Sequence, residues 1–366
     1  MNNEDARMTR RSIELTKTLI SMRSVSGSSE QDSTFLTIVN QVSKIPGARV
    51  SVSDNGMSAV FTTGLDDRES PDRPKKSVVF VGHIDTVPPM DRDSWQSSPF
   101  EADERDGRLY GRGSSDMKSG LAAALAVFER ACREGLPCVV AMTKDEEIGC
   151  LGAPSAVEIL DRIPMSGMVI MESTNNIIRF GHRGALWLRL ISRGKAAHGS
   201  NPSLGVNAIV RMMGASAGIQ RIPLESDDCL GNETCNLGTM HGGAVPNIVP
   251  DYCAGELDIR TVRDHADSLV EYLQSIDGID EVETEFSLSP VWTDPDDPWV
   301  ASLPGERDVE PVTYFTEASI FAAQLSQKIP IIVCGPGDPT CVHSVNESVP
   351  LQAIAQATEH FWNYIQ

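Results

Sequence analysis

The 366-residue sequence is poor in positive charge. It holds 31 lysines and arginines against 51 aspartates and glutamates, which gives a formal net charge of −20. Nucleic acids and anionic membrane surfaces are bound through basic patches, so this balance argues against both as partners. Long hydrophobic runs are also missing, since no stretch of about 18 apolar residues occurs and the opening MNNEDARMTR has no hydrophobic signal core. These absences predict a soluble, cytoplasmic protein.

The eight cysteines form no Cys-x-x-Cys pair and are scattered along the chain. Zinc ribbons need such pairs, and disulfide frameworks belong to small secreted domains. We therefore expect free thiols and neither kind of site.

One stretch combines a strand pattern with polar residues that can bind a ligand. The apolar run 78–81 is followed by His83, Ile84 and Asp85, which predicts a buried strand with polar groups at its carboxyl end. Side chains alternate along a strand, so His83 and Asp85 lie on one side. A metal-binding histidine usually has its second ring nitrogen held by a carboxylate or carbonyl. A His-x-Asp pair also occurs by chance, so further ligands are needed.

Five further candidate residues follow apolar strands or precede a helix. They are Asp116, Glu146, Glu147, Glu172 and His343. In open α/β sheets ligands bind beyond the carboxyl ends of the strands, where such residues converge. Two imidazoles with three or four carboxylates suit two divalent metal ions, most simply zinc, with one bridging carboxylate. Taken alone, Asp116 is equally well explained as the cap of the helix expected over 120–132.

The order of predicted elements indicates two domains, as the chain length also does. Residues 180–293 follow the order strand, helix, strand, strand, helix, strand, which is the ferredoxin-like arrangement of an inserted α+β domain. Residues 1–179 and 294–366 form the α/β catalytic, metal-binding domain. The charged, proline-containing residues 65–76 are expected to be a solvated loop.

Seven segments resemble the metal-dependent amidohydrolase and exopeptidase family that includes acetylornithine deacetylase, succinyl-diaminopimelate desuccinylase, aminoacylase and carboxypeptidase G. They are GHIDTVPP (82–89), DGRLYGRGSSDMKSG (106–120), TKDEEIGCLGA (143–153), ME (171–172), GKAAHGSNPSLGVNAI (194–209), GGAVPNIVPDYCAGELDIR (242–260) and the stretch from GPG to H-x-x-x-E (335–347). They keep the family's order over most of the chain. The resemblance implies a zinc-exopeptidase-like catalytic domain with an inserted ferredoxin-like dimerisation, or lid, domain.

The resemblance also implies a ligand set for two divalent ions, Zn²⁺ or alternatively Co²⁺. His83, Asp116 and Glu172 would hold one ion. Asp116, Glu147 and His343 would hold the other, with Asp116 as the bridge. The peptide bond after Asp116 is expected to be cis, as in the family.

Catalytic roles follow from the same resemblance. Glu146 would be the general base and Asp85 would orient His83. A two-metal site lowers the pKa of a bridging water, but a carboxylate must still accept its proton and pass it to the leaving amine. His198 would donate to the oxyanion in the active site of the other subunit, which implies a homodimer formed through the inserted domain.

Substrate contacts are predicted at five positions. Asn247 and Arg260 match residues that bind a free α-carboxylate, for which the planar fork of arginine is suited. Gly335 and Gly337 are expected to leave backbone donors exposed. Residues 316–319 resemble the acetylornithine deacetylase branch, so Glu317 is predicted to face the cationic side chain of an ornithine-like substrate. Interaction of Glu317 with a helix dipole is the alternative.

The predicted function is metal-dependent hydrolysis of the amide bond of an N-acyl-L-amino acid by a metal-bridged hydroxide. N-acetylornithine is the first substrate expected, as in arginine biosynthesis. A dipeptide, a carrier-linked lysine or ornithine, or succinyl-diaminopimelate of lysine biosynthesis is the alternative at the same site. A non-catalytic relative that binds small amides is a third possibility, but it would lack ligands or the base, and here every expected position is filled.

Overall fold

The computed structural model describes residues 3–65 and 76–366, so the predicted loop 65–76 lies outside the described residues except for its two ends. The chain divides into two compact units. The first unit extends to Gly181 and also contains Trp292–Val312 and Thr316–Gln366. The second unit comprises His182–Val291 and Thr313–Phe315, so three residues beyond the predicted boundary at 293 also belong to it.

The first unit is built on an eight-stranded mixed sheet with the order β1-β2-β6-β3-β7-β18-β8-β17. In chain order the strands are β1 (Arg49–Val52), β2 (Ser58–Thr63), β3 (Ser77–His83), β6 (Cys138–Thr143), β7 (Met165–Ile170), β8 (Ile178–Arg179), β17 (Arg307–Asp308) and β18 (Ile331–Val333). β3 runs parallel to both β6 and β7. Every residue of β3 is buried, as expected for a parallel strand covered on both faces.

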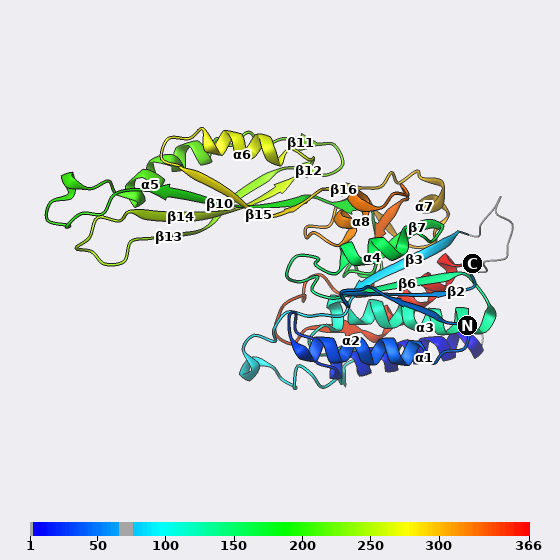
Figure 1. Ribbon diagram of the computed structural model, residues 1–366. Helices are drawn as coiled ribbons and strands as arrows, with labels where there is room; N and C mark the ends of the chain where they lie inside the picture. Colours follow the sequence, from blue (N-terminus) through cyan, green and yellow to red (C-terminus); the bar gives the residue numbers. More distant parts are fainter. Residues whose placement is uncertain (1–2, 66–75) are drawn as a thin grey trace. The chain divides into compact units, whose positions relative to one another are not determined.

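Helices lie on both sides of this sheet (Figure 1). They are α1 (Asn3–Ser21), α2 (Ser29–Val42), α3 (Ser119–Glu134), α4 (Ala153–Leu160), α7 (Pro298–Ser302), α8 (Ala318–Gln324) and α9 (Leu351–Tyr364). Alanines and leucines favour the helix in α3. The helix ends where Gly135 adopts a left-handed conformation (φ +68°), a position that glycine takes without steric cost.

Two short turns connect neighbouring antiparallel strands of the first unit. Asp54–Gly56 connects β1 and β2, which pair antiparallel. Asp106–Gly107 connects β4 (Asp103–Arg105) and β5 (Arg108–Tyr110). β5 also pairs with β19 (Ser348–Pro350). This small sheet joins the segment that precedes Asp116 to the segment that follows His343.

The second unit has the predicted ferredoxin-like fold. Its sheet has the order β13-β14-β10-β15 with antiparallel neighbours. The elements are β10 (Gly184–Arg193), α5 (Ala208–Ile219), β13 (Thr234–Gly242), β14 (Tyr252–Thr261), α6 (Ala266–Gln274) and β15 (Glu281–Leu288). A short pair in this unit is formed by β11 (Ser226–Asp227) with β12 (Gly231–Asn232), and β9 (Gly181–His182) pairs with β16 (Val291–Trp292) where the chain enters and leaves the unit.

Helix α5 begins at Ala208 and does not include Pro202. Pro202–Leu204 forms a separate 3₁₀ turn, and the Asn207 side chain accepts a hydrogen bond from Val210 N as the cap of α5. An asparagine cap satisfies an amide that the helix leaves unpaired, so it sets the starting point. Across the described parts of the chain, helices long and apolar enough to cross a bilayer are absent.

Candidate metal centre

The first two ligand candidates lie at the end of a strand and in a kinked segment before a helix. His83 is the last residue of β3 and is fully buried. Asp116 lies in the kinked segment Ser114–Lys118, has non-helical backbone angles and precedes a cis peptide bond, as the resemblance implied. Since α3 begins only at Ser119, and the Asp116 carboxylate lies against His83 and His343, Asp116 is not the cap of that helix.

The ligand atoms form two groups that share Asp116. In the first group, His83 Nε2 lies 3.2 Å from Asp116 Oδ1 and 3.5 Å from Glu172 Oε1. In the second, His343 Nε2 lies 3.1 Å from Asp116 Oδ2 and 2.9 Å from Glu147 Oε2. One carboxylate therefore presents one oxygen to each group, which is the arrangement of a bridging ligand.

The donors in these groups fit divalent metal ions. Ligands about 2.1 Å from a tetrahedral zinc ion stand roughly 3.4 Å apart, close to the measured spacings of 2.9–3.5 Å. Glu147 Oε1 is buried and has no hydrogen-bond partner in the part of the chain that the structure describes. A buried oxygen without a partner, on a carboxylate that contacts the His343 imidazole, has the character of a metal ligand. Imidazole and carboxylate together suit zinc and its neighbours.

The electrostatics of the site favour cations. Burial, together with the charge of Asp116, raises the pKa of Glu172 to about 8. Hydrogen bonds to Asp116 and Glu147 raise the pKa of His343 to about 10. Burial also raises the pKa of Glu147. The site thus gathers more carboxylates than it has side-chain cations to balance them, and divalent ions held by these residues would supply the missing positive charge.

Glu146, the expected general base, is buried beside the ligand groups, and that burial raises the pKa of its carboxyl well above the usual value. Its backbone N–H donates to Asp85 Oδ1 at 3.2 Å. The other oxygen of Asp85 accepts from Glu147 N and from Ser26 Oγ. The Asp85 carboxylate therefore fixes the turn that carries Glu146 and Glu147.

Asp85 also contacts His83, mainly through its backbone. His83 Nδ1 lies 3.0 Å from the backbone oxygen of Asp85, whereas the nearest carboxylate oxygen is 3.5 Å away. A backbone carbonyl orients a metal-binding histidine as well as a carboxylate does. Asp85 therefore contacts His83 as the sequence pattern indicated, with the backbone carbonyl as the nearer of the two possible acceptors.

Glu317 does not fit its predicted contact with a substrate side chain. It lies at the start of α8 with 1% of its surface exposed. Burial raises the pKa of Glu317 to about 7, and its oxygens make no cap hydrogen bond to the helix. A substrate ammonium group would find no accessible surface of this side chain, because the surrounding chain covers it.

Gly335 also differs from its prediction as an open backbone donor. Its N–H donates to Thr174 Oγ1 at 3.1 Å. A Cβ atom on Gly335 would collide with the backbone of Met171 and Glu172, and one on Gly337 would collide with Ser173 and Ser115. Both glycines let the loop approach the segment that carries Glu172, so their observed contribution is close packing.

The remaining predicted residues belong to the second unit. His198 is exposed, and its Nδ1 lies 2.8 Å from Ser200 Oγ. Asn247 is also exposed and accepts a hydrogen bond from Gly199 N. Arg260 makes a two-pronged ion pair with Asp258, with spacings of 2.9 and 3.0 Å. Asp258 was not anticipated, although the Asp-x-Arg spacing places both side chains on one face of a strand.

Sequence reasoning also passed over two buried charged residues beside Asp116, namely Arg112 and Glu347. Their side chains form an ion pair of 2.7 Å with exposures of 1% and 0%. The H-x-x-x-E segment could have indicated Glu347, because a charged residue so close in sequence to a ligand histidine is a candidate for holding the ligands in place.

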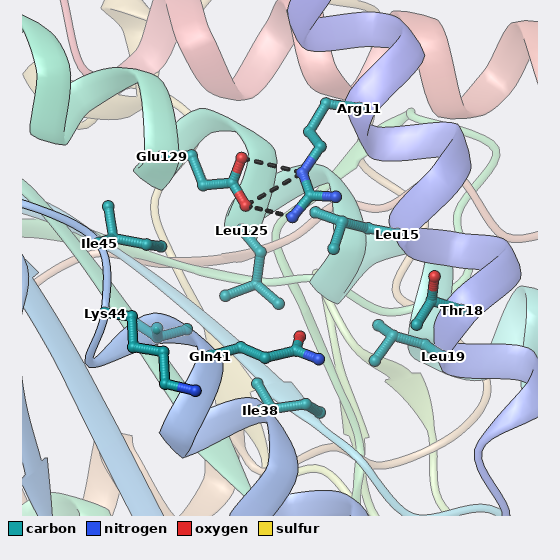
Figure 2. A pocket seen from close by; sticks show the side chains of 11 residues that line it. Arg11, Leu15, Thr18, Leu19, Ile38, Gln41, Lys44, Ile45, Leu125 and Glu129 are labelled. Carbon is teal, nitrogen blue, oxygen red and sulfur yellow. Dashed lines mark hydrogen bonds and ion pairs between the residues drawn. The ribbon is translucent and has the colours of Figure 1, made fainter.

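A separate groove of about 320 Å³ lies among three helices of the first unit (Figure 2). Its lining comes from α1, α2, the loop after α2, and α3. Leu15, Ile38 and Leu125 give it an apolar floor, and Arg11 on one wall donates to Glu129. The metal-ligand groups, by contrast, follow the strands.

An α/β sheet beside two candidate ligand groups that share one aspartate is an arrangement that suits a class of protein, the metal-dependent hydrolases. The sequence matches the model of Peptidase family M20/M25/M40 over residues 79–366. The chain belongs to this family, and it is a metal-dependent amidohydrolase or metallopeptidase.

Curated relatives cover most of the chain. A succinyl-diaminopimelate desuccinylase of Delftia acidovorans is 27% identical over 371 residues, which is 93% of each chain. A succinyl-diaminopimelate desuccinylase of Bordetella parapertussis is 30% identical over 306 residues, covering 76% of this chain and 79% of the relative.

Among solved structures, an M20 family metallo-carboxypeptidase from Sulfolobus solfataricus has a TM-score of 0.77 and 17% identity, covering 100% of this chain and 99% of that one. A dinuclear metal-binding peptidase of the M20 family from Bacillus subtilis has a TM-score of 0.68 and 14% identity, covering 98% of both chains. These similarities establish the fold of the chain.

Proposed function

We propose that this protein hydrolyses the amide bond of a small N-acyl-L-amino acid or dipeptide at two divalent metal ions, with Zn²⁺ as the first ion to test and Co²⁺ as a substitute. The observation that carries the proposal is the pair of ligand groups joined by Asp116. His83 and Glu172 complete one group, and Glu147 and His343 complete the other.

The metal ions, Glu146 and Asp85 have different roles in the proposed reaction. Bound divalent ions polarise a carbonyl oxygen and lower the pKa of water. Glu146 takes the proton of the attacking water and passes it to the leaving amine, as a buried carboxyl with a raised pKa is suited to do. Asp85 keeps Glu146 in place through its backbone N–H.

The substrate is proposed to have a free α-carboxylate held by Asn247 and Arg260. Asp258 already neutralises Arg260, so the substrate carboxylate would share or replace that partner. The relatives compared above are named succinyl-diaminopimelate desuccinylase, which makes N-succinyl-diaminopimelate the first compound to test. N-acetylornithine, expected from residues 316–319, is the second, although the burial of Glu317 removes the contact that favoured it.

We also propose a cytoplasmic homodimer formed through the second unit, with His198 acting in the partner's active site. Several large apolar side chains of this unit are exposed. They are Leu204, Val206, Val210, Met213 and Val245. Apolar surface of this kind favours association, and the exposed His198 is free to meet a second subunit.

The test is a substrate panel with the metal-loaded protein. N-succinyl-diaminopimelate, N-acetylornithine, two further N-acyl amino acids and several dipeptides are incubated with it, and the released amine is measured. Turnover of at least one compound that stops when a chelator is added supports the proposal. If the protein binds two ions per chain and cleaves none of these compounds, the proposed substrate class is wrong.

A further inference from the structure

Glu347 is a fully buried carboxylate that lies beside the metal centre without belonging to either ligand group. Its two oxygens accept four hydrogen bonds. Oε2 accepts from Arg112 Nη1 at 2.7 Å and from Gly113 N at 2.9 Å. Oε1 accepts from Ser115 N at 2.8 Å and from Asp116 N at 3.0 Å. One side chain therefore holds three amides of the loop that presents the shared ligand.

This loop contains the short helical turn Ser114–Lys118, which is broken by a kink at Asp116 and Met117. Asp116 has φ −115° and ψ 96°, outside the helical range, and α3 starts three residues later. Its carboxylate must nevertheless offer one oxygen to His83 and the other to His343, at 3.2 and 3.1 Å. Hydrogen bonds from backbone N–H to an ionised carboxylate are short and strong, so Glu347 supplies the order that secondary structure does not.

Arg112 pairs with this carboxylate and offsets part of the cost of burying it. The guanidinium is 1% exposed and lies 5.3 Å from the ring centroid of Trp95. A buried carboxylate is tolerated when it is paired and its lone pairs are hydrogen-bonded. Both conditions are met at Glu347.

Glu347 also connects two distant parts of the chain. It lies four residues after His343, in the segment that continues into β19. Its backbone oxygen accepts from Gly111 N at 2.9 Å, and Ser115 Oγ donates to the backbone oxygen of Ser348 at 3.0 Å. The loop of Asp116 and the loop of His343 are thus tied together from both sides.

We propose that Glu347 is a positioning residue of the metal centre. By holding the amides of Ser115 and Asp116, it sets the shared carboxylate between the two histidines, and it aligns His343 with Asp116. This inference rests on the proposed role of these residues as metal ligands.

The experiment compares Glu347→Gln with the wild-type protein. A glutamine has one acceptor oxygen, and its NH₂ group would face either Arg112 and Gly113 or the amides of Ser115 and Asp116. Metal-free protein is titrated with Zn²⁺ by calorimetry. We expect affinity for the ions to fall about 10- to 100-fold, the usual loss when a group that orients a ligand is changed. With Co²⁺, the magnetic coupling between the two ions in the electron paramagnetic resonance spectrum should weaken.

Glu233→Gln is the matched control. Glu233 is a buried carboxylate of the second unit that accepts from Val262 N and Glu225 N and pairs with His265 at 2.6 Å. We expect this variant to lose thermal stability without losing metal affinity. Unchanged Zn²⁺ affinity and unchanged coupling in Glu347→Gln would overturn the inference.

Glu347→Asp decides the question if the glutamine variant does not fold. It keeps the charge and both oxygens, but its carboxylate is one methylene too short to reach all four donors. Weaker Zn²⁺ binding by a folded Glu347→Asp supports the positioning role, and wild-type affinity rejects it. Failure of the wild-type protein to bind two ions is a different result, since it would reject the proposed function itself.

Discussion

At the scale of single residues, Glu146 offers the most direct test of the chemistry. Its backbone contact to Asp85 does not depend on the side-chain charge, so Glu146→Gln should fold and keep its metal ions. We expect turnover to fall about 10²- to 10⁴-fold, the range for loss of a general base. Activity and bound metal are measured on the same preparation.

Asp145→Asn is the neighbouring control. The Asp145 side chain accepts from Gly27 N, and an asparagine oxygen accepts that bond equally well, so turnover should stay near the wild-type value. Full activity in Glu146→Gln would mean that another group is the base.

His182 gives a residue-scale prediction about pH. It is fully buried, and burial lowers the pKa of its ring to about 4, whereas an unfolded histidine titrates near 6.5. The unfolded chain therefore binds more protons between pH 4 and 6.5, and this contribution to stability, complete above pH 6.5, is lost as the pH falls towards 4. The slope from one such group is at most about 1.4 kcal/mol per pH unit.

The measurement is urea unfolding of the wild-type protein and of His182→Gln at several pH values. The difference in unfolding free energy between the two should change across pH 4 to 6.5 and be flat from pH 7 to 8. A constant difference over the whole range would contradict the assigned pKa. Carboxylates that titrate in the same range cancel in this comparison.

At the scale of elements, the centre depends on loops that approach each other closely. Gly335 touches the segment that carries Glu172, and a Cβ atom there has no space. Gly335→Ala should therefore lower the unfolding free energy by about 1–3 kcal/mol, as overpacking does, and weaken metal binding because Glu172 is displaced. Thermal unfolding and Zn²⁺ titration measure the two effects.

Gly214→Ala is the opposite case and the control. Gly214 lies inside α5, and a Cβ atom there would have no neighbour within 4 Å among the described residues. Alanine should stabilise this helix by about 0.5–1 kcal/mol, since glycine is the weaker helix former, with no change in metal affinity. If Gly335→Ala and Gly214→Ala changed the unfolding free energy and the Zn²⁺ affinity equally, close packing at Gly335 would not explain its role.

At the scale of the whole molecule, the proposed homodimer can be tested through the exposed apolar residues of α5. Val210 and Met213 are 62% and 61% exposed on α5. If they lie in a dimer interface, the double substitution Val210→Glu and Met213→Glu should halve the mass measured by analytical ultracentrifugation, because charge is costly to bury there. Turnover should fall with it if His198 acts in the partner subunit.

Leu36→Glu is the control for assembly. Leu36 is a 54% exposed apolar residue of α2 in the first unit, so its replacement should leave the mass unchanged. A monomeric double variant with full turnover would separate dimer formation from catalysis.

The sequence determined most of the elements and the residues that form the two ligand groups. The apolar runs that precede His83, Glu146 and Glu172 predicted the three strands, because periodicity and strand-end polarity are local properties of the chain. The resemblance in ordered segments then assigned Asp116 as the shared ligand, and the structure brings those atoms together. The ferredoxin-like order of the second unit followed from the same local patterns.

Tertiary structure alone decided burial and the partners of individual atoms. It placed Glu317 out of reach of a substrate, directed the Asp85 carboxylate to the turn at Glu146, and paired Arg260 with Asp258. It also placed Glu347 under Asp116, across 231 residues of sequence. Such contacts join segments that are far apart in the chain, so local sequence patterns cannot predict them. The burial of a side chain likewise depends on all the residues that pack around it.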